Sequence, residues 1–442
     1  MGKGVLGVVA VLAVVALMVP AVLAGQRVIR AVPTRRVQPT TEEPQLRNLP
    51  PGVTEAQVRS HVMAPANTQG CQMEEVGLLP EVKMPMRRVA TRLTTLPLLD
   101  VDAFRTDVHN ALKDSTVGYI MQVRKDGALI NSLIWNWAQT PLDAGKGWTE
   151  DTRMNVGSVS KFLTAVGLVK LLDSKGISYD TKIIDYLPTY WTKGPNIDQI
   201  TFRHLMTQRS GFNTGKSASD YPFMKARVAE GVPGVGSYDY ENMNFGLCRI
   251  LMPIINGEID KGANFGSIPG LNDAAWDYVA TGLYKDYMQA NVFTPAGVSN
   301  VGFGPLVGQP NALAYPFPPL NAGGWNSGDK ASIAGGAGCH LSCKELLDVI
   351  DHVRRRGTII SPQKAQYMLD NHFGIDQTIE TAAGKIYNKN GLWARNGKTE
   401  QCVAYFFPAN IEVVAFVNSP IGLDGKSLRG IVKDAYVAAL TN

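Results

Sequence analysis

Ser158 and Lys161 have the residue types and the spacing of a nucleophile and its base. Apolar residues recur at helical spacing from Val159 onward and predict a helix that begins at Ser158. Positions three apart lie on one helix face, so the Lys161 amine can lie beside the Ser158 hydroxyl. A neutral lysine could accept the hydroxyl proton, and the helix N-terminus would favour the negative charge that develops nearby. Such a lysine must be desolvated or lie beside other cations.

The Ser-x-x-Lys spacing alone does not identify a nucleophile, because it occurs twice more in the chain. Ser327 and Lys330 lie in a glycine-rich stretch, and Ser361 and Lys364 form the third match. The pair Ser361-Pro362 is typical of a helix cap followed by proline in the first turn. The context of Ser158 therefore has to distinguish it from these structural matches.

Several other kinds of catalytic site are not indicated. The chain has no Gly-x-Ser-x-Gly elbow and no His-Glu-x-x-His helix. Cys339, His340 and Cys343 lack a second cysteine pair at zinc spacing, so we interpret them as core or surface residues. The glycine-rich run 335–338 lacks the Gly-Lys-Ser/Thr ending of a phosphate-binding loop. The sequence thus predicts neither a metal nor an organic cofactor.

Four segments in sequence order resemble the serine β-lactamase and penicillin-binding-protein superfamily, in particular its class C-like branch of β-lactamase-related hydrolases and esterases. One of them is similar to the family's His-Leu-Leu-Thr-x-x-Ser-Gly segment, and another resembles the stretch that holds a Tyr-x-Asn motif. The likeness covers about residues 101–440. The four segments are Gly157–Thr164, Thr201–Phe212, Tyr238–Gly246 and Tyr284–Phe303.

The resemblance implies a role for each matching residue. Ser158 would be the nucleophile, Lys161 its proton acceptor, and Tyr240 a general base or acid across the cleft. Asn242 would hold Lys161 and a substrate carbonyl. A phenol between two cations can ionise more easily than a free one, which suits proton transfer. His204 has a helix-starting, hydroxyl-rich neighbourhood and is interpreted as structural.

The family's third motif, Lys-Thr-Gly or His-x-Gly, is matched only in part. The favoured register is Arg395-Asn396-Gly397, followed by Lys398; a competing register is Lys398-Thr399-Glu400. Gly397 would allow close substrate approach. Arg395 can bind a carboxylate but cannot donate and recover a proton. In the favoured register the backbone amides of Ser158 and Lys398 would form the oxyanion hole.

These residues predict a serine hydrolase that acts on an ester or amide bond of a small-molecule or peptide substrate through an acyl-enzyme on Ser158. The alternative is a catalytically degenerate protein of the same fold with a binding or structural role. It is motivated by Arg395 and by Glu241, which replaces a small residue beside Tyr240. Arg395 favours a carboxylate-bearing substrate, whereas loss of the usual lysine favours simple esters. The exact substrate and the oligomeric state are not indicated.

Strand patterns at both ends of this region predict an α+β fold of the β-lactamase/transpeptidase type. Turn signals at Lys125-Asp126-Gly127 and Pro408-Ala409-Asn410 each join two β-rich runs into a hairpin. A closing helix is expected over about 425–440, and a mainly helical lobe over about 171–321. Both chain ends would then contribute to one antiparallel sheet flanked by helices, with the helical lobe separate.

The N-terminal region has a different composition from the rest of the 442 residues. The apolar run 4–24 predicts a signal peptide or a membrane anchor within residues 1–24, and hence a secreted, periplasmic or membrane-anchored protein, or alternatively an organellar one. Residues 25–98 read as a proline-rich linker and an unassigned region, before a hydrolase domain over 99–442. The net charge of +5 equals the five basic residues of the first 41 positions, so no nucleic-acid partner is expected.

Overall fold

The computed structural model describes residues 44–63, 97–215, 218–319, 321–423 and 425–441. The chain divides into Met1–Glu43 and Pro44–Asn442, and all described residues belong to the second unit. Its α-helices are α1 (Glu55–Met63), α2 (Val101–Leu112), α3 (Val159–Ser174), α4 (Phe202–Met206), α5 (Tyr221–Glu230), α6 (Asn242–Asn256), α7 (Pro269–Met288), α8 (Cys343–Asp351), α9 (Pro362–Asp370) and α10 (Leu428–Ala438).

The strands belong to one large sheet and two small ones. Seven antiparallel strands form the large sheet in the order β4-β3-β2-β10-β9-β8-β7, while β1 pairs with β11 and β5 with β6. The strands are β1 (Leu98–Leu99), β2 (Gly118–Lys125), β3 (Ala128–Gln139), β4 (Lys146–Gly147), β5 (Arg153–Asn155), β6 (His340–Ser342), β7 (Gln377–Thr381), β8 (Gly384–Arg395), β9 (Lys398–Phe407), β10 (Ile411–Val417) and β11 (Leu440–Thr441).

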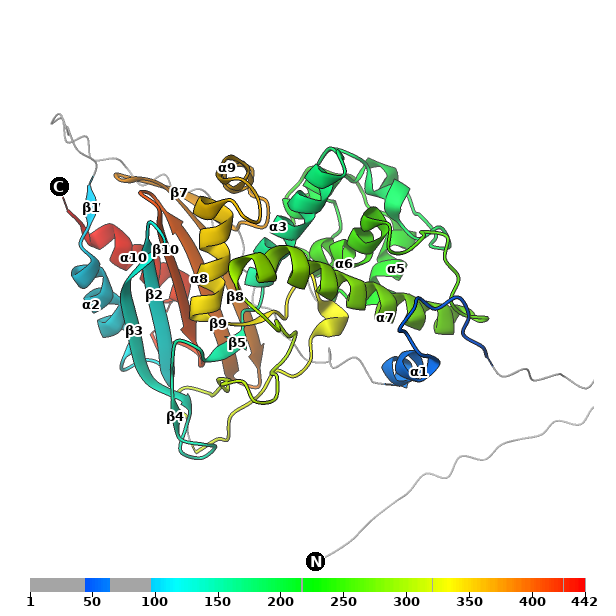
Figure 1. Ribbon diagram of the computed structural model, residues 1–442. Helices are drawn as coiled ribbons and strands as arrows, with labels where there is room; N and C mark the ends of the chain where they lie inside the picture. Colours follow the sequence, from blue (N-terminus) through cyan, green and yellow to red (C-terminus); the bar gives the residue numbers. More distant parts are fainter. Residues whose placement is uncertain (1–43, 64–96, 216–217, 320, 424, 442) are drawn as a thin grey trace, which may run out of the picture. The chain divides into compact units, whose positions relative to one another are not determined.

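Strands from both ends of this region meet at the centre of the large sheet (Figure 1). Every residue of β10 pairs with β2, from Ile411 opposite Lys125 to Val417 opposite Tyr119. The predicted antiparallel sheet built from both chain ends is therefore confirmed, and with it the α+β fold class.

Both predicted hairpins are present. Asp126 and Gly127 have φ angles of 51° and 81°, which are those of a two-residue turn whose twist matches the strands that it joins. The second turn joins β9 to β10, and its residues Ala409 and Asn410 also have positive φ angles.

The large sheet has an apolar layer on each face because side chains alternate along its strands. On β9, Val403, Tyr405 and Phe407 pack in the layer that contains α2 and α10. Their neighbours Ala404 and Phe406 pack in the layer that contains α3 and α8. Figure 1 shows α2 and α10 on one side of the sheet and α8 on the other. The second layer also supports α3, the helix that carries Ser158.

The predicted helical lobe contains α4, α5, α6 and α7, together with short 3₁₀ and π turns. Its regular helices end with the turn Thr294–Ala296, before the predicted limit of 321. Among the described residues of 297–339, the helical structure is limited to the short 3₁₀ turn Ala331–Ile333. Proline and glycine recur through 304–324 and interrupt regular hydrogen bonding there.

The described N-terminal residues pack on the helical lobe. α1 begins at Glu55, directly after Thr54, whose hydroxyl accepts from Gln57 N at 3.3 Å. Arg47 N donates to the Phe265 carbonyl at 2.8 Å. Leu46 forms an isolated antiparallel β-bridge with Gly266. Residues 45–47, within the predicted linker and unassigned region 25–98, therefore pair with the lobe through their backbone.

The predicted signal peptide or anchor over 1–24 lies outside the described residues, as do the linker residues 26–43. Among the residues that the structure describes, none of the helices combines the length and the apolar character needed to span a bilayer.

Candidate active site

Ser158 lies at the N-cap of α3, at the end of a tight turn that follows β5. We call residues 155–158 the nucleophile turn. Gly157 has a φ angle of 52°, a conformation that side-chain-bearing residues rarely adopt. Its N–H donates to Asn155 Oδ1 at 2.9 Å. The turn therefore places the Ser158 hydroxyl at the start of the helix, with only 4% of the residue exposed.

Lys161 lies one helical turn after Ser158 and is completely buried. Its Nζ is 2.9 Å from Ser158 Oγ, 2.7 Å from Asn242 Oδ1 and 2.6 Å from the Gly336 carbonyl oxygen. Burial lowers its pKa well below the usual value, and the positive charge of Lys389 lowers it further, while Asp376 opposes them. The proximity to Ser158 that the spacing predicted is present.

Tyr240 approaches Ser158 from the helical lobe, and its hydroxyl donates to Ser158 Oγ at 2.6 Å. The Nζ atoms of Lys161 and Lys389 lie 4.9 Å and 5.3 Å from its ring centroid. Burial nevertheless raises the pKa of Tyr240 well above its usual value, and the nearby Asp376 carboxylate raises it further. The expectation that this phenol ionises easily is therefore wrong: desolvation and the Asp376 charge outweigh the Ser158 hydrogen bond, which lowers the pKa.

Asn242 and Glu241 lie at the start of α6, directly after Tyr240. Asn242 accepts the Lys161 hydrogen bond, as the resemblance implies. The buried Glu241 carboxylate accepts from the backbone N–H and the hydroxyl of Thr214, both at 2.5 Å. Its charge is thus engaged by the loop that carries Thr214, and not by Ser158 or Lys161.

The third motif does not lie in the predicted register. Arg395 ends β8 and pairs with Lys398, the first residue of β9, so Asn396 and Gly397 form the hairpin turn between them. Their φ angles are 52° and 75°. A side-chain carbon added at Gly397 would meet nothing within 4 Å, so no close approach requires glycine there. Arg395 thus lies at the end of β8 and Gly397 in the turn, while Lys398 Nζ donates to the Gly323 carbonyl at 2.5 Å.

The middle of β8 lies against the nucleophile turn instead. A side-chain carbon at Gly391 would lie 2.0 Å from the Val156 carbonyl oxygen, and one at Gly157 would lie 2.9 Å from Leu392 N. This backbone contact requires glycine on both sides. The sequence Lys389-Asn390-Gly391 has the Lys-x-Gly spacing expected of the motif, and it was missed because the favoured register began six residues later.

The backbone amides of Asn390 and Leu392, two residues apart on β8, point from the same edge of the strand. Asn390 N donates to Asp376 Oδ2 at 2.9 Å, and Lys389 Nζ contacts the same carboxylate. N–H directions alternate along a strand, so Leu392 N points from the edge that Asn390 N uses, away from β9. The backbone amide of β8 that lies against the nucleophile turn is therefore that of Leu392, and not the predicted amide of Lys398.

The remaining candidates are structural. His204 and Thr201 form a capping box at the start of α4, as a structural histidine would. The hydroxyl of Ser361 caps α9. Among the described residues, no group of three histidine, cysteine or acidic side chains could hold a metal ion.

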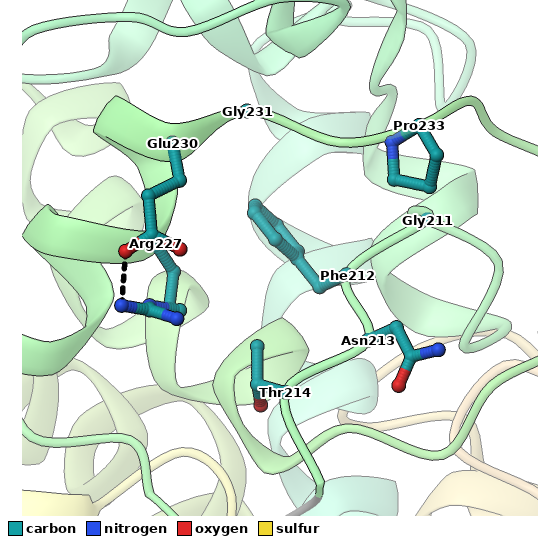
Figure 2. Close-up of a pocket in the computed structure, with 8 residues that line it drawn as sticks. All are labelled: Gly211, Phe212, Asn213, Thr214, Arg227, Glu230, Gly231 and Pro233. Carbon is teal, nitrogen blue, oxygen red and sulfur yellow. Dashed lines mark hydrogen bonds and ion pairs between the residues drawn. The ribbon is translucent and has the colours of Figure 1, made fainter.

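A pocket of about 310 Å³ lies in the helical lobe (Figure 2) and contains none of the predicted catalytic residues. Phe212 and Thr214 come from one wall, and the paired Arg227 and Glu230 at the end of α5 come from the other. Thr214 also binds Glu241, so the pocket wall and the start of α6 are joined. The site at Ser158 is separate from this pocket.

Comparisons with known proteins agree with this geometry. Residues 103–257 match the family model described as Beta-lactamase. A putative penicillin-binding protein of Bacillus subtilis is 25% identical over 160 residues, which cover 34% of this chain and 33% of that protein. An esterase/beta-lactamase of Mycobacterium tuberculosis is 27% identical over 124 residues, covering 24% and 28%. The matches thus span about a third of these relatives.

The solved structures that are similar include the octameric penicillin-binding protein homologue from Pyrococcus abyssi. It has a TM-score of 0.58 and 16% identity, over 77% of each chain. The fold is therefore that of the β-lactamases and transpeptidases. Residues 103–257 are thus similar to the Beta-lactamase family, and the fold agrees with the superfamily that the sequence resembles.

Proposed function

We propose that the protein is a serine hydrolase that cleaves an ester or amide bond through an acyl-enzyme on Ser158. The observation that carries this proposal is the convergence of Lys161 Nζ and Tyr240 Oη on one hydroxyl, at 2.9 Å and 2.6 Å. Both distances suit direct proton transfer. The class C-like branch, which includes esterases, fits the Tyr240-Glu241-Asn242 order.

The hydrogen-bond partners of Lys161 suit a neutral amine. Two of them, Asn242 Oδ1 and the Gly336 carbonyl, can only accept. A neutral amine has two N–H donors for these oxygens and one lone pair, which then faces the third partner, Ser158 Oγ. Burial and the charge of Lys389 both lower the pKa of Lys161 and so favour this form. Lys161 then accepts the Ser158 proton as the hydroxyl oxygen attacks the carbonyl carbon.

Tyr240 stays protonated because its pKa is raised, so its first role is that of a donor. When the tetrahedral intermediate collapses, the bond from the carbonyl carbon to the leaving group breaks and the phenol protonates that group. Lys161 returns a proton to the phenolate through the site's hydrogen bonds. Water then attacks the ester by the reverse sequence of transfers and releases Ser158.

The oxyanion that forms on the attacked carbonyl is stabilised by backbone amides. Ser158 N lies at the N-terminus of α3, and Leu392 N points from the free edge of β8 toward the nucleophile turn. Lys389, rather than Arg395, supplies the positive charge beside the site. Two donors aimed where charge develops account for a large share of the rate in acyl-transfer enzymes.

Labelling of Ser158 tests the proposal. The protein is exposed to a fluorophosphonate and to a fluorescent penicillin, and its intact mass is measured. We expect one adduct per chain, which is lost in Ser158→Ala and kept in Ser361→Ala, a matched serine of the same Ser-x-x-Lys spacing. Persistent labelling of Ser158→Ala would remove Ser158 from the mechanism.

The two motivations of the degenerate-site alternative are weaker in this geometry, because Arg395 lies at the end of β8 beside the hairpin turn and Glu241 binds Thr214. Arg395 then no longer favours either a carboxylate-bearing substrate or a simple ester, since Lys389 would be the lysine of the third motif. A small-molecule or peptide substrate and export or anchoring through residues 1–24 remain predictions. N-terminal sequencing of the mature protein checks whether residues 1–24 are removed on export or kept as an anchor.

A further inference from the structure

A second group of buried polar side chains lies beneath the nucleophile turn, and the mechanism above does not use it. Asn155 Nδ2 donates to Glu400 Oε2 at 3.1 Å and reaches Ser327 Oγ at 3.5 Å. Its other amide atom, Oδ1, accepts the Gly157 N–H at 2.9 Å. A single asparagine side chain therefore connects the Glu400 carboxyl to the backbone just before Ser158.

Glu400 also belongs to the strand that supports β8. It lies on β9 directly opposite Trp393, the residue after Leu392. Residues directly opposite in a sheet share a face, so the two side chains lie on the same side. Lys330 covers this position, with its Nζ 5.1 Å from the centre of the Trp393 ring. Glu400 thus contacts the nucleophile turn while its backbone holds the part of β8 that carries the second oxyanion donor.

We propose that Glu400 is a positioning residue which, through Asn155, sets the nucleophile turn against β8 and so fixes the separation of the Ser158 and Leu392 amides. The proposal rests on the acyl-transfer function of Ser158 proposed above. It assigns a role to a buried carboxyl that does not touch the reacting atoms. The close backbone contact of Gly391 with Val156 leaves little tolerance at this junction, so a small displacement there moves one amide relative to the other.

The protonation state of Glu400 gives this role a measurable signature. Burial raises its pKa to about 7, against the opposing effects of Ser327, Asn155 and Lys330. His340, on β6 opposite Asn155, stays neutral in this range because burial lowers its pKa to about 3. An ionised carboxylate accepts a stronger, charge-assisted hydrogen bond from Asn155 than a neutral carboxyl does. The turn is therefore held more firmly as the pH rises through 7.

Two measurements on the full chain test the proposal: the rate of fluorophosphonate labelling from pH 5 to 9, and hydrogen exchange of the peptide that contains Gly157, corrected for the intrinsic pH dependence. The variants are Glu400→Gln and, as a matched control, Glu412→Gln. Glu412 is also a buried glutamate whose pKa is raised to about 7, but it bonds to Arg354, at 2.7 Å. Glu400→Asp, whose shorter side chain withdraws the carboxyl from Asn155 while Asn155 keeps its bond to Gly157, replaces Glu400→Gln should that variant not fold.

We expect the labelling rate of the native protein to have an inflection near pH 7, in addition to the rise set by Lys161, and Gly157 to become more protected above pH 7. Glu400→Gln should lose both and label about 10- to 100-fold more slowly, the loss that a displacement of up to 1 Å produces. Glu412→Gln should retain both. A Glu400→Gln variant with the native inflection and the native protection would overturn the proposal.

The two measurements separate this proposal from the proposed function. If Ser158 of the native protein is not labelled, the hydrolase function fails, and hydrogen exchange still decides the positioning role. Equal protection of Gly157 in the native protein and in Glu400→Gln would then overturn it as well. If labelling of Ser158 occurs but is independent of Glu400, only the positioning role fails.

Discussion

Gly391 packs its backbone directly against that of Val156, so closely that a side-chain carbon at position 391 would lie 2.0 Å from the Val156 carbonyl oxygen. Val156 lies two residues before Ser158, and Gly391 one residue before Leu392. This contact therefore sets the distance between the nucleophile and the strand that faces it.

Gly391→Ala should separate β8 from the nucleophile turn. The added carbon cannot be accommodated against backbone, so we expect Ser158 labelling to fall by about 100-fold or more and stability to fall by about 1 to 3 kcal/mol. Labelling kinetics and urea unfolding measure the two effects. Gly397→Ala is the control: its positive φ angle costs about 1 to 2 kcal/mol, but open space surrounds the position and labelling should persist. Equal labelling of both variants would contradict this prediction.

Lys389→Met should shift the pH dependence of acylation to higher pH. In the proposed mechanism Lys161 must be neutral, so the rate should rise with pH through the pKa of Lys161. Removing the Lys389 charge removes a repulsion that lowers this pKa and leaves Asp376, which raises it, without its ion-pair partner. Stopped-flow acylation across pH shows the shift. Lys398→Met, in which a lysine of the β8–β9 turn is lost, should leave the profile in place; a shift of equal size there would indicate a long-range charge effect.

Tyr240→Phe should affect substrates according to their leaving groups. Because the phenol protonates the leaving group, an amide substrate should lose about 100-fold in acylation rate, whereas an activated aryl ester should lose much less. Tyr238→Phe is the matched control. Burial also raises the pKa of Tyr238, but the tyrosine hydroxyl that donates to Ser158 is that of Tyr240. An equal loss on amide and ester would assign Tyr240 a binding role only.

His340→Leu should make the protein more resistant to acid than the native form. Both ring nitrogens of His340 are buried without a hydrogen-bond partner, and burial lowers its pKa to about 3. A histidine whose folded-state pKa is depressed contributes stability above its unfolded pKa of about 6.5 and loses it as the pH falls. Between pH 6.5 and 5 the native protein should therefore lose about 2 kcal/mol relative to the variant. Urea unfolding at the two pH values measures this difference; parallel curves would contradict it.

The sequence was informative where local rules decide the structure. The β2–β3 hairpin follows from Asp126-Gly127, and the pairing of Ser158 with Lys161 follows from helical spacing, because both depend on residues close in the chain. The burial that raises the pKa of Tyr240 depends on packing between distant segments, which no local pattern records.

The error in the third motif has a physical explanation. Asn396-Gly397 is the strongest short signal for a two-residue hairpin, and it should have assigned these residues to a turn. Counting back along the strand that leads into such a turn reaches Lys389-Asn390-Gly391, whose glycine is the one that needs close approach. The motif register was therefore accessible from the sequence once the turn was recognised.

The pairing of β2 with β10 also determines when the site around Ser158 can first assemble during synthesis. Ser158 emerges from the ribosome long before Leu392, and the sheet that presents Leu392 is closed only when β10 joins β2. Contacts between such distant segments form slowly and late. Under the proposed mechanism, a growing chain therefore carries Ser158 without the strand that faces it, and a chain that stops anywhere before β8 should not be labelled at Ser158.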